Sequence, residues 1–161
     1  MRLSFSKHVL DNNVRKIGGL HPAIRKDATA FLDHFLQEEQ TELFITHGFR
    51  TFEEQDLLFD KGRGTGTKIV TFAKGGESYH NYGLAFDVIP WNYKDHIADY
   101  QNWSIIGAVG KRFGFTWGGD FETFHDRRHF QKTFGYDYRT LRQLLAQNQL
   151  SDGFAILNDH V

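Results

Sequence analysis

A turn that leads into a strand can be read from Ser78-Tyr79-His80-Asn81-Tyr82-Gly83-Leu84-Ala85-Phe86-Asp87. Gly83 provides the turn, and bulky apolar residues then alternate with smaller ones, which is the period-2 pattern of a strand. Asp87 falls on the same face as the small Ala85, opposite the bulky residues. Because burial of an ionised carboxylate without a partner is unfavourable, Asp87 requires a cation.

A second segment with metal-binding residue types follows further along the chain, in Asp126-Arg127-Arg128-His129-Phe130. With His80 before the turn and Asp87 in the strand, His129 would complete a set of two histidines and one carboxylate. Zinc accepts such a set in tetrahedral array and leaves the fourth position to water. Proton transfer needs a carboxylate that is not itself a ligand, and Asp126 is the nearest candidate.

Other partners for Asp87 stay open when the residues alone are considered. An ion pair with Arg50 or Arg128 would satisfy the carboxylate as well as a metal would. His125 competes with His129 as a ligand, although a displacement of one residue would send it to the opposite face. Non-haem iron also takes two histidines and a carboxylate, but that class usually spaces its first pair two apart, unlike the seven found here.

Arg50 lies in a loop between an expected strand and an expected helix, and its guanidinium has two interpretations. It could form a surface salt bridge, or it could act as a fork for the carboxylate of a substrate, which guanidinium groups recognise in a bidentate way. The residues alone slightly favour the salt bridge.

The composition of the chain excludes several classes of site and partner. The 161 residues fit one domain, 1–161, that can bury a core without metal or disulfides, so any metal is expected to be catalytic. The absence of cysteine excludes thiolate sites and disulfides. A net charge of −1 argues against a nucleic-acid partner. No segment is apolar enough for a signal peptide or a membrane span, which predicts a soluble chain made in the cytoplasm.

Periodicity predicts an α+β fold in which a small antiparallel sheet carries the metal site and helices flank it. A threonine-to-glutamate capping box opens one of the helices at Thr51. Helices are expected at residues 22–36, 51–59, 103–113 and 138–150, strands at 42–46, 84–89, 115–117 and 129–131, and an edge strand at 69–72 within a Gly-rich loop over 61–76. The tail from residue 151 to 161 is expected to be weakly ordered.

The two-part motif Ser78-x-His80-x-x-Gly83-x-Ala85-x-Asp87 and Asp126-x-x-His129-Phe130 resembles that of zinc peptidases that cut peptidoglycan stem peptides. These comprise the VanY-type D-alanyl-D-alanine peptidases and the L-alanyl-D-glutamate endopeptidases of phages and bacilli, and the chain is more similar to the endopeptidase branch. The resemblance covers residues 20–135. It rests also on Gly48-Phe49-Arg50-Thr51-Phe52-Glu53-Glu54-Gln55 and Trp117-Gly118-Gly119-Asp120.

The resemblance implies a role for particular residues. His80, Asp87 and His129 become the ligands of one zinc ion per chain, and Asp126 becomes the general base. Arg50 and Ser78 match positions near the substrate, and Arg63 is also expected to reach it. The chain departs from the family pattern at three positions, with His47 in place of serine, Phe72 in place of asparagine and Arg128 in place of proline.

The resemblance also implies an activity. The chain is expected to be a monomeric zinc metallopeptidase that hydrolyses an amide bond of the peptidoglycan stem peptide, as an L-alanyl-D-glutamate endopeptidase. As a phage endolysin it would wait in the cytoplasm and reach the cell wall after the membrane is permeabilised. The alternatives are a D-alanyl-D-alanine carboxypeptidase or dipeptidase, and a non-catalytic wall-binding module in which the metal is structural.

Overall fold

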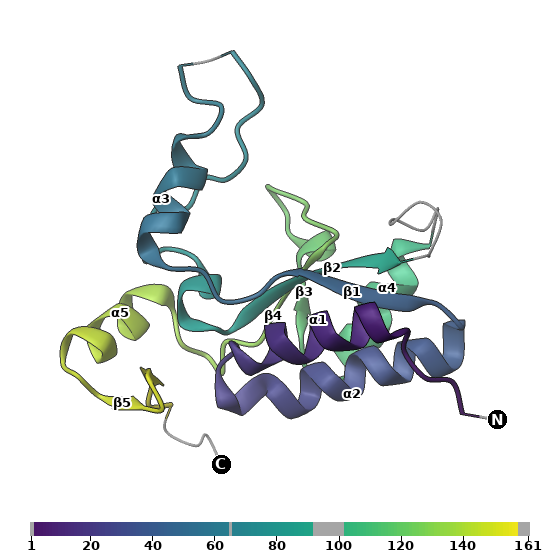
Figure 1. Cartoon of the computed structure of the whole chain (residues 1–161). Helices are drawn as coiled ribbons and strands as arrows, with labels where there is room; N and C mark the ends of the chain where they lie inside the picture. The colour runs from purple at the N-terminus through teal and green to yellow at the C-terminus, as the bar shows by residue number, and fades with distance from the viewer. Residues whose placement is uncertain (1, 65, 92–101, 158–161) are drawn as a thin grey trace.

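Helices and a small sheet make up the computed structural model, which describes residues 2–64, 66–91 and 102–157 (Figure 1). The α-helices are α1 (Lys7–Gly18), α2 (Pro22–Glu39), α3 (Phe52–Asp60), α4 (Trp103–Arg112) and α5 (Tyr138–Ala146). The strands are β1 (Glu42–His47), β2 (Ala85–Trp91), β3 (Thr116–Trp117), β4 (His129–Gln131), β5 (Leu150–Ser151) and β6 (Phe154–Ala155). Two 3-10 turns, η1 (Tyr79–Tyr82) and η2 (Gly118–Asp120), precede β2 and follow β3. The α+β class predicted from the sequence is confirmed.

The main sheet has the strand order β1-β2-β4-β3, and all of its neighbouring strands are antiparallel. Asp87 therefore has a direct partner on each side, which is His47 in β1 and His129 in β4. The register of β1 shifts between Ile45 and His47. A bulge of this kind re-aims the side chain that follows it. The central strand thus brings residues from three distant parts of the sequence beside one carboxylate.

The core lies between α2 and the sheet (Figure 1). Phe31 of α2 is fully buried, and its ring centroid is 5.0 Å from that of Phe130 and 6.3 Å from that of Phe86. Both partners belong to the face of the sheet opposite Asp87, as the alternation in β2 predicts. The buried apolar side chains support the sheet from one side, and Asp87, His129 and Gln131 lie on its other face.

The first helix, α1, has no counterpart among the elements predicted from the sequence. It covers the outer edge of β1 through two buried asparagines. The Asn12 side chain donates to the Ile45 carbonyl at 2.9 Å. The Asn13 side chain donates to the Leu43 carbonyl at 2.8 Å and accepts from the Ile45 amide at 2.9 Å. These contacts occupy backbone groups that an edge strand would otherwise leave unpaired.

The edge strand predicted at residues 69–72 does not form, and this segment is irregular. Val70 and Phe72 are 49% and 63% exposed, so little apolar burial supports a strand here. The edge of β1, one of the two outer strands of the main sheet, is already occupied by α1. The Gly-rich segment is a loop that rises with α3 away from the sheet (Figure 1).

The C-terminal prediction is also corrected. Helix α5 ends at Ala146, and β5 and β6 then pair as a hairpin where weak order was expected. Ala155 is buried, and its carbonyl lies 2.9 Å from Nε2 of His21. Residues 158–161 of the expected tail lie outside the described part. No helix within the described residues is long and apolar enough to cross a membrane.

Candidate metal centre

Three elements bring the metal-binding candidates together. His80 lies in η1, Asp87 in the middle of β2 and His129 at the start of β4. Gly83 ends η1 with φ +68°, and a Cβ on this residue would lie 2.6 Å from the His21 amide nitrogen. Only glycine fits this turn without strain, and the turn is what sets His80 beside the strand that carries Asp87.

The donor atoms have the spacing that a tetrahedral ion requires. Nε2 of His80 is 3.2 Å from Nδ1 of His129, and Oδ1 of Asp87 is 3.3 Å from the first and 3.2 Å from the second. Ligand atoms placed tetrahedrally about 2.0–2.1 Å from zinc lie about 3.3–3.4 Å from one another. Within the described residues, no other group of three histidine or carboxylate side chains comes together in this way. The group can therefore hold a metal.

Hydrogen bonds behind each histidine fix which nitrogen faces the metal position. Nδ1 of His80 donates to the Gly48 carbonyl at 2.8 Å, which leaves Nε2 as the free donor atom. Nε2 of His129 donates to Oε1 of Gln131 at 2.9 Å, which leaves Nδ1. Outer partners of this kind orient metal-binding histidines and raise their basicity. Sequence reasoning missed both partners, although Gln131 lies two residues after His129 and shares its face of the strand.

The charges within the group favour a cation. Burial acts to raise the pKa of the Asp87 carboxyl, but the facing His80 and His129, together with His47, hold this pKa well below its usual range. Burial lowers the pKa of His80. Burial also acts against the charged form of His129, but the hydrogen bond with Asp87 outweighs it and raises the pKa of that histidine. A cation that binds to Nδ1 of His129 takes the place of a proton.

Asp126 lines the same cleft as His80, Asp87 and His129, a hollow described below, but does not belong to the donor group. Its backbone is anchored, because its amide donates to the Gly118 carbonyl at 2.9 Å and its carbonyl accepts from the His129 amide at 3.1 Å. Oδ1 of Asp126 accepts from the Arg128 amide at 3.1 Å. Proline, which the family pattern has at this position, carries no amide hydrogen and could not make that bond. The departure at Arg128 therefore gives Asp126 an additional support.

The ion pairs considered as alternatives for Asp87 do not form. Within the described residues, its ion-pair partners are the three histidines His47, His80 and His129. Neither Arg50 nor Arg128 lies within ion-pair distance of it. The slight preference for a surface salt bridge at Arg50 is therefore wrong for the described part of the chain.

Arg50 and Ser78 both line the cleft. Nη1 of Arg50 donates to Oε1 of the buried Gln55 at 2.7 Å, and the Arg50 amide donates to the His80 carbonyl at 3.1 Å. Asn81, which sequence reasoning left without a role, donates to the Arg50 carbonyl at 2.9 Å and accepts from the Gly76 amide at 2.9 Å. This buried amide ties the Arg50 loop to the turn that carries His80.

Two residues predicted from the sequence as candidates, one for substrate binding and one for metal binding, lie outside the site. Arg63 stacks 3.5 Å above the Phe59 ring and donates to the carbonyls of Phe59 and Thr71. It is absent from the lining of the cleft, so its predicted contact with substrate is not supported. His125 is exposed, and its Nδ1 lies 3.1 Å from the Gly119 carbonyl rather than in the donor group.

Two neighbouring hollows share lining residues around Asp87. The first, which we call the metal cleft, has a volume of about 460 Å³ and contains Arg50, Ser78 and the three donors. The second, which we call the outer hollow, has a volume of about 400 Å³ and contains Lys68, Ile69, His125 and Arg128. The residues that line both are His47, Val70, Asp87, Phe124 and Asp126. Both hollows therefore reach the carboxylates of Asp87 and Asp126.

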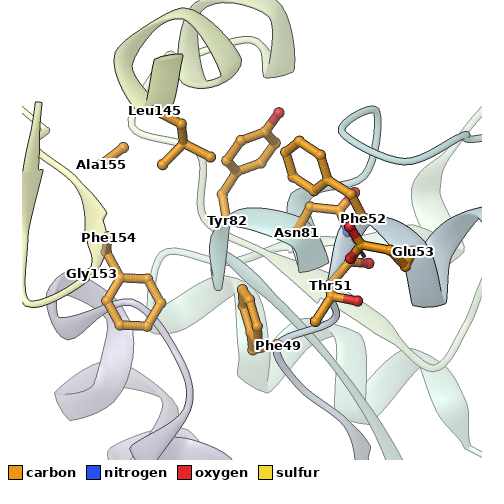
Figure 2. Close-up of a pocket in the computed structure, with 10 residues that line it drawn as sticks. All are labelled: Phe49, Thr51, Phe52, Glu53, Asn81, Tyr82, Leu145, Gly153, Phe154 and Ala155. Carbon is orange, nitrogen blue, oxygen red and sulfur yellow. Dashed lines mark hydrogen bonds between the residues drawn. The ribbon is translucent and has the colours of Figure 1, made fainter. Parts of the chain in front are cut away.

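A third cavity, of about 240 Å³, is lined in part by Asn81 and Tyr82 of η1 (Figure 2). Phe49, Tyr82 and Phe154 form its walls, and the C-terminal hairpin closes one end. Of the groups discussed above as chemically competent, none lines it. We therefore assign the chemistry to the metal cleft.

Comparison with known proteins identifies the family of the chain. The model of a peptidase M15 family, described as D-alanyl-D-alanine carboxypeptidase, matches residues 71–132, which include the three donors and Asp126. The peptidoglycan L-alanyl-D-glutamate endopeptidase CwlK of Bacillus subtilis (strain 168) is 39% identical over 122 residues, which make up 70% of this chain and 72% of CwlK. The class is thus that of the peptidases. The chain belongs to the M15 peptidase family, as its resemblance to zinc peptidases predicted.

Solved structures share the fold. The L-Ala D-Glu endopeptidase ChiX of Serratia marcescens aligns with a TM-score of 0.56 and 19% identity over 83% of this chain and 92% of ChiX. A vancomycin resistance D,D-pentapeptidase VanY, solved in complex with Zn(II), aligns with a TM-score of 0.56 and 19% identity over 70% of this chain and 72% of that one.

Proposed function

We propose that this chain is a zinc-dependent L-alanyl-D-glutamate endopeptidase that acts on the peptidoglycan stem peptide. The observation that carries the proposal is the group of His80, Asp87 and His129, whose donor atoms lie 3.2–3.3 Å apart and border a cleft. Two imidazole nitrogens and one carboxylate oxygen, with a side open to the cleft, are the donor set of a catalytic zinc site. The related VanY structure, which contains Zn(II), supports the choice of metal.

The endopeptidase activity has two supports. CwlK, which is 39% identical, carries that name. In addition, Asp87 and Asp126 line both the metal cleft and the outer hollow, so space for substrate extends beyond a single cleft. An enzyme that cuts within a chain has to hold substrate on both sides of the scissile bond, whereas a carboxypeptidase needs only a short site beyond it.

Each side chain of the site has a separate role in hydrolysis. A bound zinc ion would supply Lewis acidity for the scissile carbonyl and for the attacking water. Asp126 takes a proton from that water and passes it to the departing amine, because a carboxylate that is not a ligand can act first as base and then as acid. Arg50, held by Gln55, binds the carboxylate of the substrate beside the scissile bond.

Digestion of purified peptidoglycan, with and without a chelator, tests the proposal. Mass spectrometry should find new L-alanine carboxyl termini and D-glutamyl amino termini, and the chelator should prevent them. Release of free D-alanine alone would instead establish a D-alanyl-D-alanine carboxypeptidase, the activity after which the matching family model is described. The endolysin role and the site of action at the cell wall stay predictions. Lysis of bacterial cells that express the chain together with a membrane-permeabilising protein would test both.

Asp126→Ala separates an enzyme from a wall-binding module. The enzyme is expected to keep its zinc and to lose about 10²–10⁴-fold in kcat, the usual contribution of a general acid–base group. Zinc content measured by atomic absorption gives the control. A variant with unchanged hydrolysis would contradict the role of Asp126.

A further inference from the structure

The outer hollow has its own chemical character. Its lining combines the apolar Ile69 and Val70 with two basic side chains, Lys68 and Arg128. Both basic residues are exposed, and neither forms an ion pair with a carboxylate in the residues that the structure describes. Both basic side chains are therefore available to a ligand, and they share the lining with Ile69 and Val70.

An exposed aromatic pair adjoins this hollow: Phe124 lines both hollows, and Phe72, which lines neither, contacts Phe124. Phe72 is 63% exposed and Phe124 is 40% exposed. Their rings meet edge to face with centroids 5.6 Å apart, which joins the Gly-rich loop to the segment before Asp126. Exposed apolar side chains that gather beside polar groups mark ligand-binding surfaces. Phe72 is also a position at which the chain departs from the asparagine of its family.

The position of Arg50 sets the direction of the substrate. Arg50 and Ser78 line the metal cleft and are absent from the outer hollow. In the bond between L-alanine and D-glutamate, the α-carboxylate lies on the glutamate side, so that side belongs with Arg50 in the metal cleft. The alanine side of the bound substrate must then extend into the outer hollow. In peptidoglycan, the amino group of this alanine is joined to the lactyl group of an N-acetylated amino sugar.

We infer that the outer hollow binds this lactyl-bearing amino sugar, an inference that rests on the endopeptidase activity proposed above. One face of the pyranose ring carries C–H groups and packs on the Phe72–Phe124 pair, where burial of apolar surface stabilises it. Lys68 and Arg128 donate hydrogen bonds to the carbonyl oxygens of the lactyl and acetamido groups. The enzyme therefore recognises the stem peptide together with its point of attachment to the glycan.

Two substrates that differ only at the amino group of alanine test the inference. One is a stem peptide with an N-acetylated L-alanine, and the other is the same peptide with N-acetylmuramic acid in place of the acetyl group. For the zinc-loaded protein we expect a higher kcat/KM with the sugar-linked peptide. In Phe72→Ala, the ratio of the two kcat/KM values should fall by about three- to tenfold, the range expected for loss of one aromatic contact.

Two variants serve as controls. Phe72→Tyr keeps the ring and should keep the ratio of the parent protein. Val14→Ala removes side-chain surface from a residue of α1 that is also 63% exposed and is absent from both hollows, and it should leave the ratio unchanged. Equal kcat/KM values for the two substrates in the parent protein, or an unchanged ratio in Phe72→Ala, would overturn the inference.

A binding measurement separates this inference from the proposed activity. If neither peptide is cut between alanine and glutamate, the proposed activity fails. Titration of the protein with N-acetylmuramoyl-L-alanine then tests whether the outer hollow binds the sugar. Binding should shift the backbone NMR signals of Ile69 and Val70, and Phe72→Ala should weaken this response. Absence of shifts at these residues up to millimolar ligand would overturn sugar binding.

Discussion

At the scale of single residues, the centre depends on groups outside the donor set. His80 and His129 each use one ring nitrogen for a fixed acceptor, Gly48 or Gln131, and present the other to the metal position. Because a neutral imidazole has one donor and one acceptor nitrogen, the outer hydrogen bond selects the tautomer. The geometry of the centre is therefore set partly by an amide side chain and a backbone carbonyl.

Gln131→Leu should weaken metal binding. The substitution keeps the approximate size of the side chain but removes the acceptor for Nε2 of His129, so zinc affinity is expected to fall about 10–100-fold. Competition with a chromophoric chelator measures this affinity. Gln131→Glu, which retains an acceptor, should stay close to the parent protein. Equal affinities for the leucine and glutamate variants would contradict the role assigned to Gln131.

At the scale of elements, the edge of β1 is closed by a helix rather than by another strand. Asn13 makes two hydrogen bonds to backbone groups of β1 with its buried side chain. Since β1 also holds His47 and leads into the Arg50 loop, α1 supports one side of the metal cleft from a distance.

Asn13→Ala is expected to lower the free energy of unfolding by about 2–3 kcal/mol, because it leaves buried groups of the Leu43–Ile45 segment without partners. Chemical denaturation measures the change. Asp11→Ala removes an exposed side chain from the same helix and should change stability little. A similarly small effect of Asn13→Ala would show that water replaces the lost hydrogen bonds.

His21 links helix α2 to the C-terminal hairpin and should make stability depend on pH. Its Nδ1 accepts from the Ala23 amide, and its Nε2 donates to the Ala155 carbonyl, an arrangement that requires the neutral ring. Burial lowers the pKa of His21 from its ordinary value of 6.5. The unfolded state then binds a proton more readily than the folded state, so stability is retained above about pH 6.5 and is lost as the pH falls below it.

Thermal unfolding between pH 7.5 and pH 5 measures this dependence. His21→Asn keeps an oxygen that can cap α2 but does not titrate. The variant should lose less stability over this pH range than the parent protein, and the difference isolates His21 from the other histidines. Parallel pH profiles for the two proteins would refute the assignment.

At the scale of the whole molecule, the core and the metal site occupy different faces of the sheet. The apolar contacts of α2 with Phe86 and Phe130 lie on one face, and Asp87 with its histidines lies on the other. The core does not include the donors. The fold is therefore expected to persist without metal.

Metal removal should abolish hydrolysis while a cooperative unfolding transition remains. Zinc at about 100 times its Kd would add about 2.7 kcal/mol, so the Tm of the metal-free protein should fall by roughly 5–10 °C in a domain of this size. Differential scanning calorimetry measures the shift, and restored zinc should reverse it. Collapse of the far-UV circular dichroism spectrum upon chelation would instead indicate a structural metal.

Several parts of this protein follow from local sequence alone. Alternation in residues 84–89 predicted β2 and the facing of Asp87, the Thr51–Glu54 capping box predicted the start of α3, and the glycine at position 83 predicted the turn. These features depend on neighbours within a few residues, where side-chain periodicity and backbone preference act directly. The candidate donors His80, Asp87 and His129 could be named on the same basis.

Other features depend on residues far apart in the sequence, and the tertiary structure alone decided them. The edge of β1 was closed by Asn12 and Asn13, and Arg63 was placed against Phe59 rather than in the cleft. The strand register set His129 against Asp87 and placed Gln131 behind it. Local patterns carry no information about such pairings, because they are chosen by competition among distant partners for the same buried hydrogen bonds and surfaces.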